Sequence, residues 1–153
     1  MKAWVSGQVA AEIAHEAGEH EPLEAGGMLL GYWSGDDVVV TSCIASGPRT
    51  KRGTTWLVPD QEWQMARLGE VYEASGRLTT YLGLAYPPRW CALSKLRDRR
   101  TLRAVRRSKD ARTPRPLMMI VGPRAEDAPF LWCLTGGLKP IAVVLEVFEP
   151  RVQ

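Results

Sequence analysis

Three side chains that could do chemistry stand at two places in the sequence. Glu24 precedes a glycine-rich apolar run, and Ser94 and Asp98 lie at the start of a strongly basic segment. A carboxylate can accept a proton or bind a metal ion, and a hydroxyl can donate a hydrogen bond to a developing negative charge. Each also has an ordinary alternative. Glu24 could be a solvated loop carboxylate, and Ser94 or Asp98 could cap a helix.

Histidine, a common ligand of catalytic zinc, is missing from both places. The chain has two histidines, His15 and His20, and both precede Glu24. Catalytic zinc is held by three protein ligands, with water in the remaining position. One aspartate does not make such a site, so these residues argue against zinc-dependent hydrolysis there.

The elements that must position these residues are read from hydrophobic periodicity and turn residues. Ser6 and Asp60 are predicted to cap helices that end near Ala17 and Ser75, and a basic helix is predicted over 95–109. Trp63, Leu68, Val71 and Tyr72 are expected on the core side of the second helix. Strands are predicted over 2–5, 27–33, 38–44, 55–58, 78–84, 117–121, 130–134 and 141–148. The pattern predicts one α+β domain over residues 1–153, with a mixed, mostly antiparallel sheet flanked by about three helices.

Residues 24–31, EAGGMLLG, closely resemble the opening signature of the JAB/MPN (JAMM) metalloprotease family. The similarity continues through Gly47-Pro48, Pro59-Asp60 with Trp63, and residues 75–83, in the same order along nearly the whole chain. Family members remove ubiquitin or ubiquitin-like proteins from their targets, or cut related peptide bonds, using one zinc ion. The resemblance implies the JAB/MPN, cytidine-deaminase-like architecture.

The family's chemistry uses a His-x-His-Pro run and a downstream aspartate to hold zinc. A glutamate takes the proton of the zinc-bound water, and a serine stabilises the oxyanion. By resemblance, Glu24 corresponds to the general base, Ser94 to the oxyanion serine and Asp98 to the metal ligand.

The chain departs from the family at both histidine positions. Alignment on Pro87 and Ser94 places Leu84 and Tyr86 there, although it needs a two-residue deletion after Gly83 and one extra residue before Asp98. Alignment on Gly83 instead places Tyr86 and Pro88 at these positions. Leucine has no lone pair, and a phenol that ionises at about pH 10 is a poor zinc ligand.

Three hypotheses follow from the resemblance and the departure. The first is a pseudoenzyme with a degenerate metal site, which holds no cofactor and binds a ubiquitin-like tail or another partner protein. The second is an active zinc metallopeptidase with other ligands, such as Cys91, Asp98 and one histidine. The third is an interaction module that uses its basic helix.

The positive charge of the chain is concentrated in one segment. Residues 88–116 contain eleven basic and two acidic residues and so carry +9; because the whole chain carries +3, the remainder carries −6. Arg99, Arg103, Arg106 and Arg107 recur at helical spacing and predict one cationic face. That face is either solvated, a docking site for an acidic protein tail, or a weak phosphate contact. Trp90 is the one aromatic residue near it, so nucleic acid is disfavoured.

Composition indicates a cytoplasmic protein. Hydrophobic residues make up 45% and charged residues 24%, and no apolar run is long enough for a membrane helix. Cys43, Cys91 and Cys133 are widely spaced, which predicts reduced thiols. Four tryptophans are expected in the core and two at the surface; the core set is Trp33, Trp56, Trp63 and Trp132, and the surface set is Trp4 and Trp90.

Overall fold

The computed structural model describes residues 1–54, 56–86, 96–120, 130–137 and 139–149, without the side chains of residues 86, 96–98, 130 and 132. The strands are β1 (Lys2–Ser6), β2 (Gly27–Ser34), β3 (Asp37–Ala45), β4 (Lys51–Arg52), β5 (Leu57–Val58), β6 (Thr80–Tyr86), β7 (Leu117–Ile120), β8 (Phe130–Cys133) and β9 (Ile141–Phe148). The helices are α1 (Gly7–Glu19), α2 (Gln61–Ala74) and α3 (Leu96–Arg107). No helix of the described chain is long and apolar enough to span a membrane.

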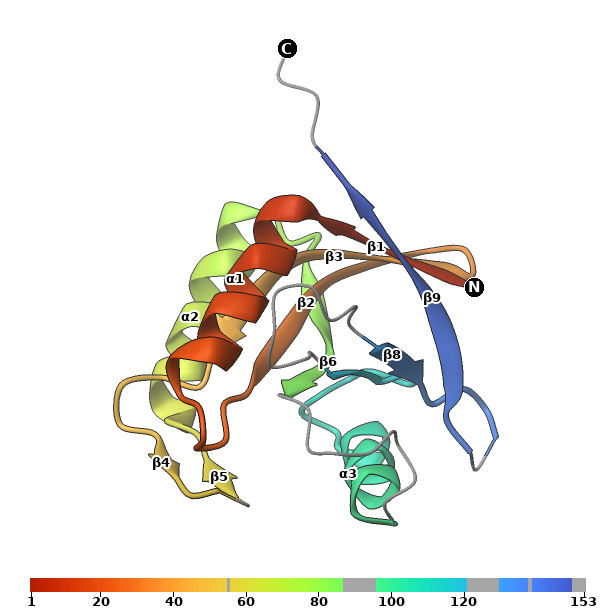
Figure 1. The fold of residues 1–153 in the computed structure, drawn as a ribbon. Helices are drawn as coiled ribbons and strands as arrows, with labels where there is room; N and C mark the ends of the chain where they lie inside the picture. Colours follow the sequence, from red (N-terminus) through yellow and green to blue (C-terminus); the bar gives the residue numbers. More distant parts are fainter. Residues whose placement is uncertain (55, 87–95, 121–129, 138, 150–153) are drawn as a thin grey trace.

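Seven of the described strands form one closed sheet in the order β1-β3-β2-β6-β7-β8-β9 (Figure 1). Strand β1 runs parallel to β3 and β9, and β6 runs parallel to β7. The other four pairings are antiparallel. The predicted mixed, mostly antiparallel sheet with three helices is therefore confirmed. The parallel pairing of β1 with β9, which closes the sheet, was not predicted.

Helix α1 packs its apolar side into the main core. Ser6 caps the helix as predicted, because its Oγ accepts a hydrogen bond from the Val9 N–H at 3.3 Å. Val9 and Ile13, one helical turn apart, are buried together with residues of the sheet. Among these sheet residues are Ala3, Val5, Leu29, Val38, Val40, Leu117 and Met119.

Helix α3 packs on the opposite face of the sheet. Leu102 is fully buried and forms a second cluster with Met118, Leu134 and Ile120. Successive residues of a strand point to opposite faces, so Met118 lies outside while Leu117 and Met119 of the same strand lie in the main core. Figure 1 shows α3 at the far end of the molecule from α1.

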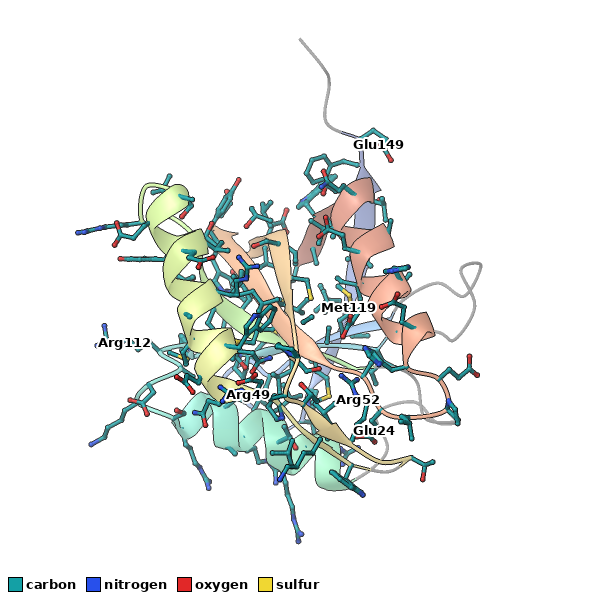
Figure 2. The ribbon with its side chains drawn as sticks, turned by 90° about the vertical axis from the view of Figure 1, so that its left-hand side faces the viewer. Glu24, Arg49, Arg52, Arg112, Met119 and Glu149 are labelled. Atoms are coloured by element: carbon teal, nitrogen blue, oxygen red, sulfur yellow. The ribbon has the colours of Figure 1, made fainter. Side chains whose placement is uncertain are left out.

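Helix α2 has a side that is only partly buried: of the residues expected on its core side, Trp63, Leu68 and Val71 are partly buried and Tyr72 is exposed. Gln64 is its buried residue and donates from Nε2 to the Ala45 carbonyl at 3.0 Å. Tyr72, expected in the core, is 38% exposed. Helices α1 and α2 both contact β3, and Figure 2 shows the strands lying between them.

The predictions for individual tryptophans and cysteines had mixed outcomes. Trp33 packs against the main core as expected, whereas Trp56 is 47% exposed because it lies on the small β4–β5 hairpin outside the closed sheet. Trp90, the Trp132 side chain and Cys91 lie outside the described residues. Cys43 and Cys133 are free thiols, as predicted.

Candidate functional site

The pairing of β6 with β2 brings Glu24 close to the positions where histidines were expected. Gly27, the first residue of β2, pairs with Ala85, and Met28 pairs with Leu84. Glu24 precedes Gly27 by three residues, so its loop begins where β6 ends. On its other side β6 pairs with β7, where Leu84 lies opposite Met118.

The face on which Leu84 lies is apolar. Ala85 is 4% exposed and belongs to the main core, so the alternation of the strand places Leu84 on the other face. This is the face of Met118, on which α3 packs through Leu102. At the first expected ligand position, the described structure therefore has a hydrocarbon side chain beside a small apolar cluster.

The remaining predicted site residues are described only in part. The backbone of Tyr86 pairs with Ile120, and Asp98 belongs to the first turn of α3. The side chains of both lie outside the described part of the chain, as does the whole of Ser94. Their predicted roles stay predictions.

The backbone of Glu24 is held from both sides by the β4–β5 hairpin. Its N–H donates to the Gly53 carbonyl at 2.8 Å, and its carbonyl accepts from Arg52 Nη1 at 3.0 Å. Arg52 Nη2 also donates to Oγ of the fully buried Ser46 at 3.3 Å. Figure 2 shows Arg52 and Glu24 at the same end of the molecule. The Glu24 backbone is thus fixed by hydrogen bonds that the sequence did not reveal.

Two glycines allow the strands at the site to approach closely. A Cβ on Gly27 would lie 2.5 Å from the Ile44 carbonyl oxygen and 3.2 Å from Cys43 Sγ. A Cβ on Gly83 would meet the Leu117 carbonyl oxygen, and the φ of Gly83 is +156°. Any larger residue would push β6 or β2 away from its neighbour, so both glycines help to set the distance between the Glu24 loop and β6.

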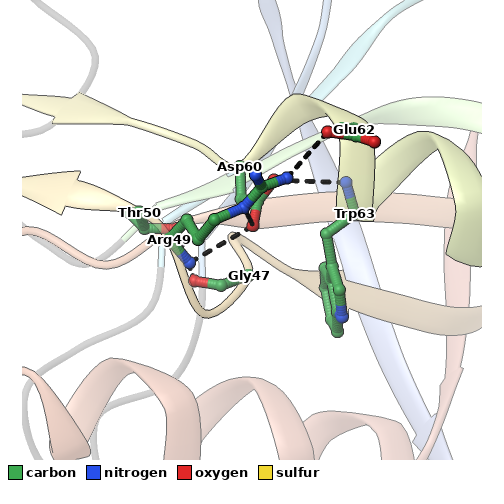
Figure 3. Close-up of polar contacts among 6 residues, drawn as sticks. All are labelled: Gly47, Arg49, Thr50, Asp60, Glu62 and Trp63. Carbon is green, nitrogen blue, oxygen red and sulfur yellow. Dashed lines mark hydrogen bonds and ion pairs between the residues drawn. The ribbon is translucent and has the colours of Figure 1, made fainter.

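Asp60 fixes the loop that precedes α2 (Figure 3). Its Oδ2 accepts from the Arg49 N–H at 3.2 Å and from Arg49 Nε at 3.1 Å, and its Oδ1 accepts from the Trp63 N–H at 3.2 Å. The Asp60 N–H donates to the Ser46 carbonyl at 2.8 Å. The hydrogen bond from the Arg49 side chain is the main cause that lowers the pKa of Asp60 below 3.8.

These contacts give a structural role to the region around Gly47, Asp60 and Trp63, where the sequence resembles the JAB/MPN family. Asp60 bonds to Ser46, Ser46 bonds to Arg52, and Arg52 bonds to the Glu24 carbonyl. Helix α2 and the Glu24 loop therefore belong to one hydrogen-bonded unit. Sequence reasoning missed Arg52 because a basic residue in a short loop carries no mark of the carbonyl it will bind.

The described residues around Glu24 do not fit a zinc site of the histidine type. Leu84 offers no donor atom. In the described part of the chain, one group of three potential ligands lies close together, namely Glu16, Glu19 and His20 at the end of α1, with ligand atoms within 4.8 Å of one another. His20 Nε2 already lies 3.3 Å from Glu16 Oε1, a contact between side chains one helical turn apart, which accounts for their proximity.

His15 and the partly buried Cys43 do not supply ligands to the Glu24 loop either. His15 lies on the exposed side of α1, with its Nε2 3.2 Å from Glu19 Oε1. Burial raises the pKa of the Cys43 thiol to about 12, with Glu16 and Glu12 adding to the shift. Within the described residues, neither His15 nor Cys43 belongs to a group of three potential metal ligands.

Comparison with known proteins extends these observations. No protein-family profile matches the chain. The solved structure of protein DSY2949 from Desulfitobacterium hafniense superimposes with a TM-score of 0.70, at 17% identity, over 97% of this chain and 94% of that chain, which shows a shared fold. Probable metalloprotease y4qB of Sinorhizobium fredii is 34% identical over 150 residues, covering 95% of this chain and 90% of that protein. The chain therefore belongs to the metalloprotease-like family that y4qB represents.

Proposed function

We propose that this chain is a JAB/MPN-type member of the family whose zinc site is degenerate, and that it binds a ubiquitin-like tail or another partner protein without cutting it. The observation that carries the proposal is the position of Leu84. It lies on β6 beside the first residues of β2, on the apolar face next to Met118. A hydrocarbon at this place favours binding over metal-dependent hydrolysis.

The surface around the Glu24 loop supports a protein as the ligand. Leu23 precedes Glu24 and is 40% exposed, and Trp56 and Val58 on the adjoining hairpin are 47% and 55% exposed. Gly53 connects them, because its carbonyl bonds to the Glu24 N–H and its own N–H bonds to the Trp56 carbonyl at 2.9 Å. Exposed aromatic and aliphatic side chains that lie together are typical of protein interfaces.

Binding is tested directly with purified ubiquitin-like proteins that carry an extended C-terminal tail. Trp56→Ala is expected to weaken binding by about tenfold or more, as the loss of a central aromatic contact does at protein interfaces. Tyr72→Ala, on the exposed side of α2, is the matched control and should bind as the wild type does. Equal binding by wild type and Trp56→Ala would show that the β4–β5 hairpin does not contact the partner.

Hydrolysis is the second candidate function, because the relative is itself described as a probable metalloprotease. In that case Asp98, Cys91 and a histidine would be the ligands to examine. The two functions differ in metal content and in cleavage. Stoichiometric zinc that is lost in Asp98→Ala, together with cleavage of a ubiquitin-like fusion, would establish the enzyme and overturn the binding proposal.

A further inference from the structure

The described contacts that attach helix α3 to the rest of the fold include those of Leu102 and Arg106. Leu102 is fully buried against Met118 and Leu134. Arg106 Nη1 donates to the carbonyls of Thr135 at 2.6 Å and Gly137 at 3.2 Å, so this arginine ties the helix to the segment that follows β8. The sequence had placed Arg106 on a free cationic face, and that part of the prediction is wrong because its guanidinium is used inside the fold.

The side of α3 that faces away from Leu102 carries the exposed charge. At a rotation of about 100° per residue, Arg100 and Arg107 point almost opposite to Leu102. Both are exposed, and Ala104 between them is a small exposed residue. Seven residues separate the two arginines, which is about 10 Å along a helix. We call Arg100, Ala104 and Arg107 the cationic face; of the four arginines that the sequence predicted on such a face, only Arg107 belongs to it, because the other three are partly buried.

Several arginines elsewhere in the molecule are paired with carboxylates, whereas in the part of the chain that the structure describes those of the cationic face are not. Arg49, Arg67, Arg77 and Arg115 each lie within 4.0 Å of an aspartate or glutamate oxygen. Within the described residues, neither Arg100 nor Arg107 makes an ion pair of this kind. Their charge is available to a binding partner.

Basic residues beyond α3 add to this positive charge. Lys109 and Arg112, both exposed, follow the helix and extend the positive charge beyond its end.

We propose that the cationic face binds an acidic polypeptide segment, carried by the protein partner of the proposed function. Acidic residues at every second position of an extended chain share one face and lie about 7 Å apart, so two long arginine side chains whose positions are about 10 Å apart can each reach a carboxylate. Helix α3 contains no aromatic residue on which bases could stack, which disfavours single-stranded nucleic acid. The charge of −6 on the rest of the chain would also repel a long polyanion more than a short acidic segment.

The test uses a fluorescent peptide of alternating glutamate and serine that is long enough to span α3, with binding to the full chain followed by anisotropy. Wild type is expected to bind at low ionic strength and more weakly as salt is added. Arg100→Glu combined with Arg107→Glu should reduce the affinity by about tenfold or more, because both contacts become repulsive. Arg67→Glu on α2, combined with Arg77→Glu in the turn after this helix, makes the same charge change elsewhere and should retain wild-type affinity within roughly twofold.

Equal losses in the two double variants would show that net charge alone attracts the peptide and would overturn the proposal. Wild-type affinity in the Arg100→Glu, Arg107→Glu variant, with an unchanged circular dichroism spectrum, would overturn it as well. If an oligonucleotide bound wild type more tightly than the peptide does, and did not bind the Arg100→Glu, Arg107→Glu variant, the ligand of the cationic face would be nucleic acid and not a polypeptide. Trp56→Ala should leave peptide binding intact, so failure of the tail-binding proposal is distinguishable from failure of this one.

Discussion

At the scale of single residues, the contacts of Asp60 join three parts of the molecule. The carboxylate caps α2 and binds Arg49, and the Asp60 N–H donates to the carbonyl of Ser46, whose hydroxyl accepts from the arginine that holds Glu24. Its side chain is only 4% exposed, so the bond to Arg49 is partly shielded from water. A change at Asp60 is therefore expected to affect the Glu24 loop as well as α2.

Protonation of Asp60 gives the first prediction. Because its pKa in the folded protein lies below 3.8, its contribution to stability is present above about that pH and is lost as the pH falls through the lower folded value. Asp60→Asn should be less stable than wild type at pH 7, and the difference should shrink in acid. Urea unfolding at neutral and acidic pH measures this. A constant difference across the range would contradict it, and Asp110→Asn is the exposed control.

The thiols of the partly buried Cys43 and the buried Cys133 give a second prediction. Burial raises the pKa of Cys43 to about 12 and that of Cys133 to about 11. Since the thiolate is the reactive form, both should react with iodoacetamide far more slowly in the native protein than in urea. Mass spectrometry of tryptic peptides identifies the labelled positions. Rapid labelling of Cys43 in the native protein would mean that α1 opens readily from β3.

At the scale of elements, short sequence patterns predicted most helices and strands, but they could not predict contacts between residues far apart in the sequence. The caps Ser6 and Asp60 could be recognised because a capping side chain bonds within a few residues of its own position. The core side expected for α2 left out Gln64, its buried residue, because a polar side chain gives no local sign of the Ala45 carbonyl that it binds in β3. Arg52 was missed for the same reason, since its partner Glu24 is 28 residues away.

The attachment of α3 gives a third prediction. Leu102→Ala should lower the free energy of unfolding by about 2–5 kcal/mol, because it leaves a cavity against Met118 and Leu134. Arg100→Ala, on the exposed side of the same helix, should change it by less than about 0.5 kcal/mol. Urea titration of both variants gives the comparison. Similar effects of the two changes would mean that α3 is not seated through Leu102.

At the scale of the whole molecule, the closed sheet explains how the proposed degenerate site would keep its framework. The strands that border the site, β2 and β6, are paired on both sides within the sheet, and the Glu24 backbone is bonded to a separate hairpin. None of these contacts requires a metal ion. Loss of the histidines would therefore leave the fold intact and its surface open to a binding role.

The same reasoning predicts that the proposed zinc site can be rebuilt. Leu84→His combined with Tyr86→His converts residues 84–87 to His-Ala-His-Pro, and with Asp98 this supplies the three protein ligands that catalytic zinc needs. The double variant should take up about one equivalent of zinc and melt at a higher temperature when zinc is added, because ligand binding to the native state stabilises it. Adding Asp98→Asn should abolish both effects, whereas Asp110→Asn should not. Zinc uptake that does not depend on Asp98, or none at all in a folded variant, would show that residues 84–98 are not the remnant of a family zinc loop.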